Sequence, residues 1–132
     1  MAEKLKIPLN LKHKPIIYCD IQGKDSSDAK FISLGHASWN YEDFSIKIFR
    51  KPNNRWSRQS EELTPERLLS ATLLLVSQIF DSSTAIAKEK IPEETWAEKK
   101  LMKRIRDPRN IKLLKKIQQI LDKQNIKYSK EI

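Results

Sequence analysis

Two segments in the first half of the chain alternate between apolar and polar residues, as half-buried β-strands do. Residues 16–21 (IIYCDI) are mostly β-branched or aromatic, and their alternation places Cys19 on the same face as Ile17. Residues 44–49 (FSIKIF) alternate more regularly, with one face formed by Phe44, Ile46 and Ile48. We therefore expect two strands, and we expect Cys19 to be a small buried hydrophobic residue.

The segments around these strands predict a short helix and a hairpin. Residues 29–39 (AKFISLGHASW) follow a polar loop rich in capping residues and predict a helix, with a turn at residues 40–43. A second turn is expected at residues 51–54 (KPNN), because asparagine tolerates a left-handed backbone. Residues 55–63 (RWSRQSEEL) would then return as the second strand of a hairpin, although neither of its faces is apolar beyond Trp56.

The most apolar part of the chain follows directly. Thr64 is a suitable N-cap residue, and Pro65 has the backbone angle that the first helical position needs. Residues 66–80 are apolar almost all round, which is typical of a helix covered on every side. We therefore expect a central helix covered by the sheet and by other helices.

The remainder of the chain predicts two more helices, separated at an Asp-Pro step. The first runs from Pro92 to about residue 106, with Trp96 expected to pack against apolar neighbours. Asp107 caps the second, and Pro108 occupies its first position. The predicted fold is α+β: a small antiparallel sheet with a β-hairpin packed on a central apolar helix, followed by a basic C-terminal helical pair.

Composition fits one domain of 132 residues, with an extended arm at 1–14, an α+β core at 15–87 and a basic helical tail at 88–132. A single cysteine excludes an internal disulfide, and the first ten residues lack a signal-peptide pattern, so we expect a cytoplasmic protein. The longest apolar run, residues 68–80, is too short to cross a membrane. With only 2 glycines, a phosphate-cradling glycine loop is excluded, and we expect no cofactor.

The net charge of +9 is concentrated near the C-terminus. Residues 99–116 hold nine cations and one acid, Asp107. Such a cluster is either a solvated helical face or a surface for an anionic partner such as nucleic acid. The residues expected to contact that partner are Lys99, Lys100, Lys103, Arg106, Arg109, Lys112, Lys115 and Lys116.

A second candidate surface is the polar strand at residues 55–62. Arg58 is suited to clamp a carboxylate or phosphate, and Gln59 to orient a ligand. Glu61 or Glu62 would serve as a base only if burial raised its pKa. Together with Asp20, the residues Arg58, Gln59 and Glu61 form a candidate ligand pocket. The alternative is that these arginines and glutamates simply pair across the hairpin or with the neighbouring strand.

Three stretches resemble a small bacterial family of unknown function: KHKPIIYCD, SDAK…SLGHASWN and above all RWSRQSEELTPERLL. Members of that family carry a WSRQSEELP-type signature before an apolar helix. The resemblance covers about residues 7–80 and implies a bacterial source and a shared fold, but no activity. This chain departs from the signature by having Thr64-Pro65 where Leu-Pro is expected.

No enzyme signature is found. Asp20 with Lys47 lacks the spacing of a metal-dependent nuclease, and His13 and His36 have no partner at metal-ligand spacing, so no metal site is expected. The sequence therefore favours a non-enzymatic binding module with a basic helical surface for nucleic acid or another polyanion. The alternatives are a small-ligand or catalytic pocket at the hairpin, and a homodimerising scaffold.

Overall fold

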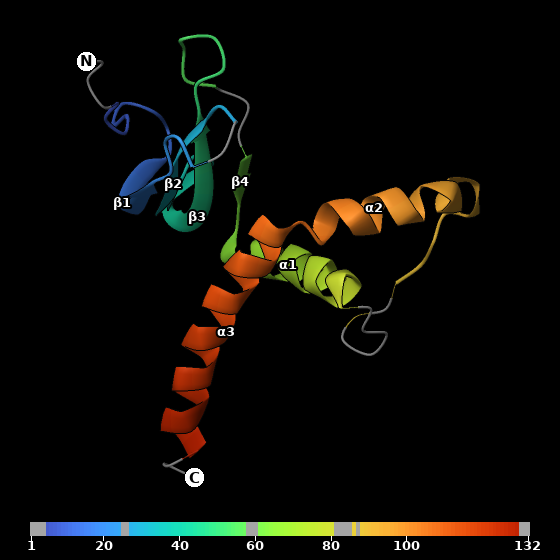
Figure 1. The fold of residues 1–132 in the computed structure, drawn as a ribbon. Helices are drawn as coiled ribbons and strands as arrows, with labels where there is room; N and C mark the ends of the chain where they lie inside the picture. Colours follow the sequence, from blue (N-terminus) through green and yellow to red (C-terminus); the bar gives the residue numbers. More distant parts are fainter. Residues whose placement is uncertain (1–4, 25–26, 58–60, 81–85, 87, 130–132) are drawn as a thin grey trace. The chain divides into compact units, whose positions relative to one another are not determined.

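The computed structural model describes residues 5–24, 27–57, 61–80, 86 and 88–129 (Figure 1). Contacts divide the chain into two compact units, Met1–Ala71 and Thr72–Ile132. The first unit holds a four-stranded antiparallel sheet in the order β1-β2-β3-β4, and the helices follow it in the sequence. The predicted α+β class is therefore confirmed.

The strands are β1 (Lys14–Asp20), β2 (Ala29–Ala37), β3 (Asn40–Arg50) and β4 (Glu61–Leu63). β1 and β3 confirm the two strands predicted from alternation. The helix predicted at residues 29–39 is wrong, because this segment is strand β2. Its true period is two: Phe31, Ser33 and Gly35 are buried on one face, and the intervening residues point to the other.

The connections around β3 also differ from the prediction. The turn expected at residues 40–43 is wrong, since β3 already begins at Asn40 and the chain reverses at Ser38 and Trp39. The turn at residues 51–54 is confirmed, with Asn54 in a left-handed conformation at φ 63°. The strand predicted at residues 55–63 is much shorter, because β4 covers only Glu61–Leu63. Its predicted middle, residues 58–60, lies outside the described residues.

One face of the sheet is covered by the N-terminal segment (residues 5–13). Ile7 packs there with Phe31 and Phe49, which face each other across β2 and β3. The rest of this covered face is polar, and its buried side chains are His13, Ser33, Ser45, Lys47 and Glu62. The predicted arm is therefore an integral part of the sheet's packing.

The opposite face of the sheet carries most of the aliphatic side chains. The register pairs Ile32 with Ile48 and Leu34 with Ile46, and both pairs lie on this face. Leu34 and Phe44 are exposed, and so is Cys19, which pairs with Ile32. The prediction that Cys19 is buried is therefore wrong, because the aliphatic face of β1 is the open one.

Helix α1 (Pro65–Ile79) begins as predicted. The backbone N–H of Arg67 donates to Thr64 Oγ1 at 3.2 Å, which is the hydrogen bond of an N-cap. The expectation that the helix is covered all round is wrong in this structure. Leu69 is 68% exposed, and of this helix only Ser77 and Ile79 are buried.

The C-terminal elements are a 3₁₀ helix η1 (Pro92–Ala97), then α2 (Glu98–Ile105) and α3 (Pro108–Ser129). The predicted break at Asp107 is confirmed, because its carboxylate accepts a hydrogen bond from the N–H of Arg109 at 2.8 Å. Trp96 is 70% exposed, so the prediction that it packs is wrong. Within the described residues, every helix is too short or too polar to traverse a lipid bilayer.

Candidate functional site

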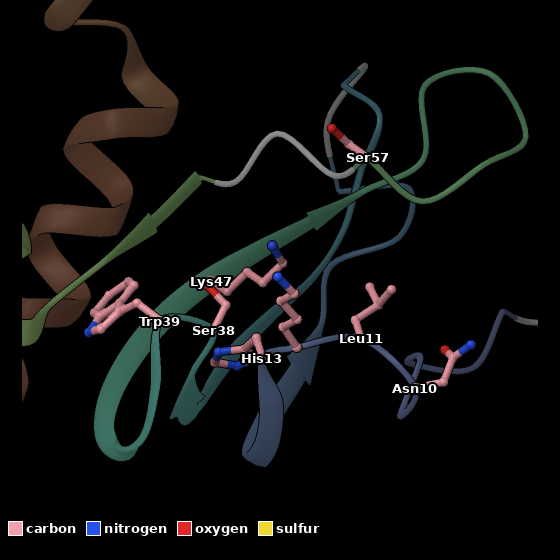
Figure 2. Close-up of a pocket in the computed structure, with 8 residues that line it drawn as sticks. Asn10, Leu11, His13, Ser38, Trp39, Lys47 and Ser57 are labelled. Carbon is pink, nitrogen blue, oxygen red and sulfur yellow. The ribbon is translucent and has the colours of Figure 1, made fainter.

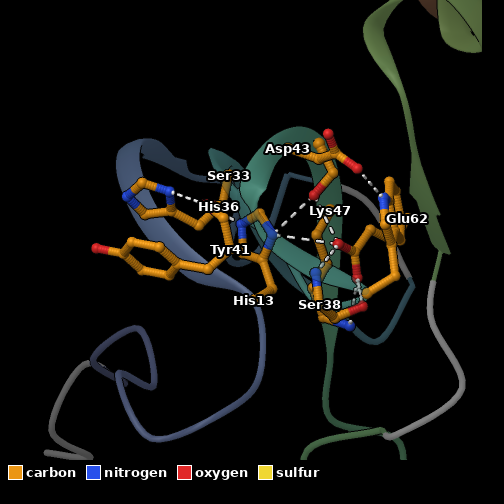
Figure 3. A network of polar contacts seen from close by, with 10 residues as sticks. His13, Ser33, His36, Ser38, Tyr41, Asp43, Lys47 and Glu62 are labelled. Atoms are coloured by element: carbon orange, nitrogen blue, oxygen red, sulfur yellow. Dashed lines mark hydrogen bonds and ion pairs between the residues drawn. The ribbon is translucent and has the colours of Figure 1, made fainter.

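A buried chain of hydrogen bonds joins the N-terminal segment to three strands (Figure 3). His13 Nε2 lies 2.8 Å from Ser33 Oγ on β2, and His13 Nδ1 lies 2.9 Å from Ser45 Oγ on β3. Ser45 Oγ in turn donates to the Glu62 carboxylate on β4 at 2.6 Å. The local strand pairing explains the convergence, since Glu62 lies opposite Lys47 and Ser45 lies opposite Gly35.

The direction of these bonds defines the state of the imidazole. Because the hydroxyl proton of Ser45 is used on Glu62, its oxygen accepts from Nδ1–H of His13. Burial lowers the pKa of His13 and so favours the neutral ring, in which Nε2 is the acceptor for the hydroxyl of Ser33. His13 is therefore held as a neutral imidazole with both nitrogens satisfied.

The pKa values of the two titratable members agree with this assignment. Burial lowers the pKa of His13, and this effect outweighs the neighbouring Glu62, which raises it. Burial alone would raise the pKa of Glu62, but hydrogen bonds from Ser45 and Ser38 outweigh it and hold the pKa below its ordinary value. Near neutral pH the pair is thus a neutral imidazole beside a carboxylate.

Glu62 is also bonded to the turn between β2 and β3. The Ser38 backbone N–H donates to Oε2 at 2.9 Å, and the Ser38 hydroxyl donates to Oε1 at 2.8 Å. Lys47 Nζ lies 3.9 Å from Oε1, which is an ion pair but longer than a hydrogen bond. The carboxylate is therefore satisfied mainly by the two serines rather than by the ammonium group of Lys47.

Next to this network is a cavity of about 620 Å³ (Figure 2). His13 and Lys47 contribute to its wall from the buried side, and Trp39 and Ser38 contribute from the β2–β3 turn. Among the described residues, those that line the cavity are Asn10, Leu11, Lys12, His13, Ser38, Trp39, Lys47 and Ser57. The cavity thus combines two ammonium groups, hydroxyl and amide groups, and two apolar walls.

The network superficially resembles a nucleophile and base. Ser33 and His13 have the distance of such a pair, and Glu62 Oε2 lies 3.4 Å from His13 Nδ1 on the opposite side of the ring. Ser33 is 0% exposed and is not part of the cavity lining, so a substrate has no access to its hydroxyl. We therefore interpret the serine–histidine contact as structural. In the described part of the chain, no group of three potential metal ligands is found.

The pocket predicted from sequence does not form as proposed. Asp20 lies on edge strand β1, where its carboxylate accepts hydrogen bonds from Gln22, and Glu61 lies on the other edge strand, β4. Glu61 is 3.4 Å from Arg50, and neither acid lines the cavity. Arg58 and Gln59 lie outside the described residues. The structure therefore does not bring Asp20 and Glu61 together.

Sequence reasoning missed most of the residues that do converge: it names Glu62 as a base on the condition that burial raises its pKa, but the pKa is lowered instead. The sequence pattern assigns His13 to an extended arm and suggests Lys47 only as a partner of Asp20. The sequence carries no direct signal of this convergence, because Ser45 and Lys47 lie opposite Phe44, Ile46 and Ile48 and are typical of a solvent-exposed face. A buried lysine on a strand usually indicates a paired charge or a ligand site.

The basic stretch in α2 and α3 is exposed to solvent. All of the predicted contact residues are exposed: Lys99, Lys100, Lys103, Arg106, Arg109, Lys112, Lys115 and Lys116. The ion pair seen among them in the described structure joins Arg109 to Asp107 at 3.1 Å. Arg106 Nε donates to the carbonyl oxygen of Ile79, and Lys100 Nζ lies 5.7 Å from the ring centre of Trp96. Most of these charges are thus not neutralised by acids in the described residues.

Residues 5–127 match the family model described as "Family of unknown function (DUF6530)". The chain belongs to this family. The match extends well beyond the residues 7–80 expected from the resemblance, and it includes both the polar network and the basic stretch. No curated protein and no solved structure matches the chain significantly.

Proposed function

We propose that this protein is a non-enzymatic binding protein of the bacterial cytoplasm, with a polyanion such as nucleic acid as the partner of its α2 and α3 cations. The observation that carries the proposal is the run from residue 99 to residue 116, in which nine cations, all exposed, stand against one acid. That acid, Asp107, is already paired with Arg109. Like charges at this density repel one another, and binding a polyanion relieves the repulsion.

The spacing of the cations suits an extended anion. Lys112, Lys115 and Lys116 are three and four residues apart, so they share one face of α3. Lys99, Lys103 and Arg106 follow the same spacing on α2 and its end. Each helix therefore offers a row of positive charge to a phosphate backbone.

The chemistry favours contact with phosphates over reading of bases. Sequence readout needs side chains placed in a groove or aromatic rings on which bases stack. Trp96 is the aromatic residue beside these cations, and Lys100 already lies over its ring. Binding is therefore expected to be largely independent of base sequence and strongly dependent on salt.

The test is fluorescence anisotropy with a labelled DNA duplex of about 20 base pairs, titrated from about 25 to 200 mM KCl. The triple variant with Lys112, Lys115 and Lys116 changed to Gln should bind more weakly, and its log–log salt slope should be smaller by about three. The control changes three exposed cations of the other unit, Lys6, Lys24 and Arg55, to Gln and therefore has the same net charge. The proposal fails if wild type does not bind at low salt, or if both triple variants lose equal affinity.

A further inference from the structure

The side chain of Lys47 is deeply buried, and its ammonium group has no hydrogen-bond acceptor among the described residues. The residue is only 6% exposed, yet it lines the cavity and its ammonium group has three N–H donors. Its contacts are the ion pair with Glu62 at 3.9 Å and the ring of Phe49, whose centre lies 5.5 Å away. No hydrogen bond joins Lys47 Nζ to any described residue, so a buried cation presents free donors to the cavity.

Glu62 does not serve as a hydrogen-bond acceptor for the ammonium group of Lys47. Its carboxylate accepts three hydrogen bonds, from the Ser38 N–H, the Ser38 hydroxyl and the Ser45 hydroxyl. All three are 2.9 Å or shorter, whereas Lys47 is a full ångström farther away. The carboxylate offsets part of the positive charge, but its oxygens are oriented toward the serines.

The charge balance around the cavity is positive. Lys12 and Lys47 each contribute a positive charge, and Glu62 contributes one negative charge from behind the lining. His13 lines the cavity as a neutral group, because burial lowers its pKa while its two nitrogens bond Ser33 and Ser45. The remaining positive charge favours an anion with one negative group near Lys47.

The other walls indicate what is attached to that negative group. Leu11 and Trp39 are apolar, and Figure 2 places them on different sides of Lys47. The indole N–H of Trp39 donates to Asp43 at 3.1 Å, which fixes the ring, and the side chain is still 50% exposed. A rigid, partly open aromatic wall is suited to contact a planar or aliphatic ligand body.

We propose that this cavity binds a small organic carboxylate with an apolar or aromatic body, whose carboxylate accepts hydrogen bonds from Lys47. Of the two lining lysines only Lys47 is buried, since Lys12 is exposed, and one buried ammonium group with an apolar surround suits a carboxylate better than a phosphate, which is usually held by more donors. The site uses none of the α2 and α3 cations, so it stands independently of the proposed binding of a polyanion.

The experiment is an NMR titration of the full chain with benzoate, benzyl alcohol and inorganic phosphate. Benzoate should shift the Trp39 indole and Ser38 amide resonances with a Kd of about 1 mM or tighter, and benzyl alcohol should bind about tenfold more weakly. Tighter binding of inorganic phosphate than of benzoate overturns the choice of a carboxylate. Absence of benzoate shifts at about 10 mM overturns the site itself.

Variants identify the residues responsible. Lys47→Met should weaken benzoate binding about tenfold or more, whereas Lys24→Met, on an exposed loop, should leave it unchanged. Since Lys47→Met also removes the counterion of Glu62, its folding is checked by circular dichroism. Trp39→Ala supplies a second variant, because this exposed residue lies outside the buried network. The proposal is overturned if folded Lys47→Met binds like wild type, or if Trp39→Ala does so.

Discussion

Glu61 and Glu62 are neighbours on one strand in opposite environments, which makes the same substitution at both a direct test of the buried network. Glu62→Gln keeps the size of the side chain and removes its charge. One carboxylate oxygen becomes an NH₂ group, which cannot accept the hydrogen bond of Ser38 or of Ser45. Lys47 also loses the only ion-pair partner that it has among the described residues.

The magnitude follows from these contacts. A hydrogen bond to a charged group contributes about 1.5–3 kcal/mol, and the ion pair at 3.9 Å has a Coulomb energy of about 4 kcal/mol at an effective dielectric constant of 20. Part of the lost free energy is offset, because burying a neutral amide costs less than burying a carboxylate. Breaking a buried pair from one side usually costs about 3–5 kcal/mol, and we expect Glu62→Gln to lie in that range.

Urea unfolding near neutral pH measures the effect, and hydrogen exchange of the β3 amides localises it to the first unit. A loss of about 3 kcal/mol would lower the urea midpoint by about 1–3 M. Glu61→Gln is the matched control. The Glu61 side chain is half exposed and its contact is Arg50 at 3.4 Å, so its charge contributes little to stability.

The pH dependence of stability is a second, independent test of the contribution of Glu62. The pKa of Glu62 is lowered in the folded state, so its contribution is present above the unfolded pKa near 4.5 and is lost as the pH falls further. The difference between wild type and Glu62→Gln should therefore shrink below pH 4.5. Equal urea midpoints for the Glu61 and Glu62 variants near neutral pH would refute the reasoning.

Two further predictions concern β2 and the imidazole. A Cβ on Gly35 would collide with the carbonyl oxygen of Lys14, so Gly35→Ala should lower stability by about 3 kcal/mol or separate β1 from β2. An alanine Cβ at Gly23 meets no atom within 4 Å, but the φ of 71° there strains any L-residue, so Gly23→Ala should cost only about 1–2 kcal/mol, and equal thermal midpoints for the two variants would contradict this. The pKa of His13 lies below 6.5 in the folded state, so the free energy of unfolding should fall as the pH decreases through 6.5. His13→Asn should remove that slope in urea titrations, and a slope that persists would exclude His13 as its source.

The sequence pattern within a short window was enough to predict one strand, one helix start and one helix break. The alternation of β3, the Thr64 cap of α1 and the break at Asp107 all follow from neighbouring residues, and all are found. Strand β2 was mistaken for a helix because Phe31 and Leu34 also fit a helical stripe. The deciding contact, the close approach of Lys14 to Gly35, comes from a different strand and is invisible to a local window.

The candidate site was harder to predict because the covered face of this sheet is largely polar, whereas the covered face of a sheet is usually apolar. Aliphatic residues such as Ile46 suggest the buried face by hydrophobicity, yet the face covered by the N-terminal segment carries Ser45 and Lys47. Only the register shows that Glu62, rather than Glu61, meets Lys47. The exposure of the tail cations was anticipated because their density alone makes mutual burial too costly.

The first dozen or so residues look dispensable in the printed sequence, and shortening them to improve expression would be a natural choice. Removing the residues up to and including His13 would delete the imidazole that bonds both Ser33 and Ser45. It would also remove Ile7, which packs on Phe31 and Phe49. The remaining strands would then expose the carboxylate of Glu62 and the ammonium group of Lys47, which are buried in the intact chain. The amino end should therefore be cut no further than residue 4 when this protein is produced.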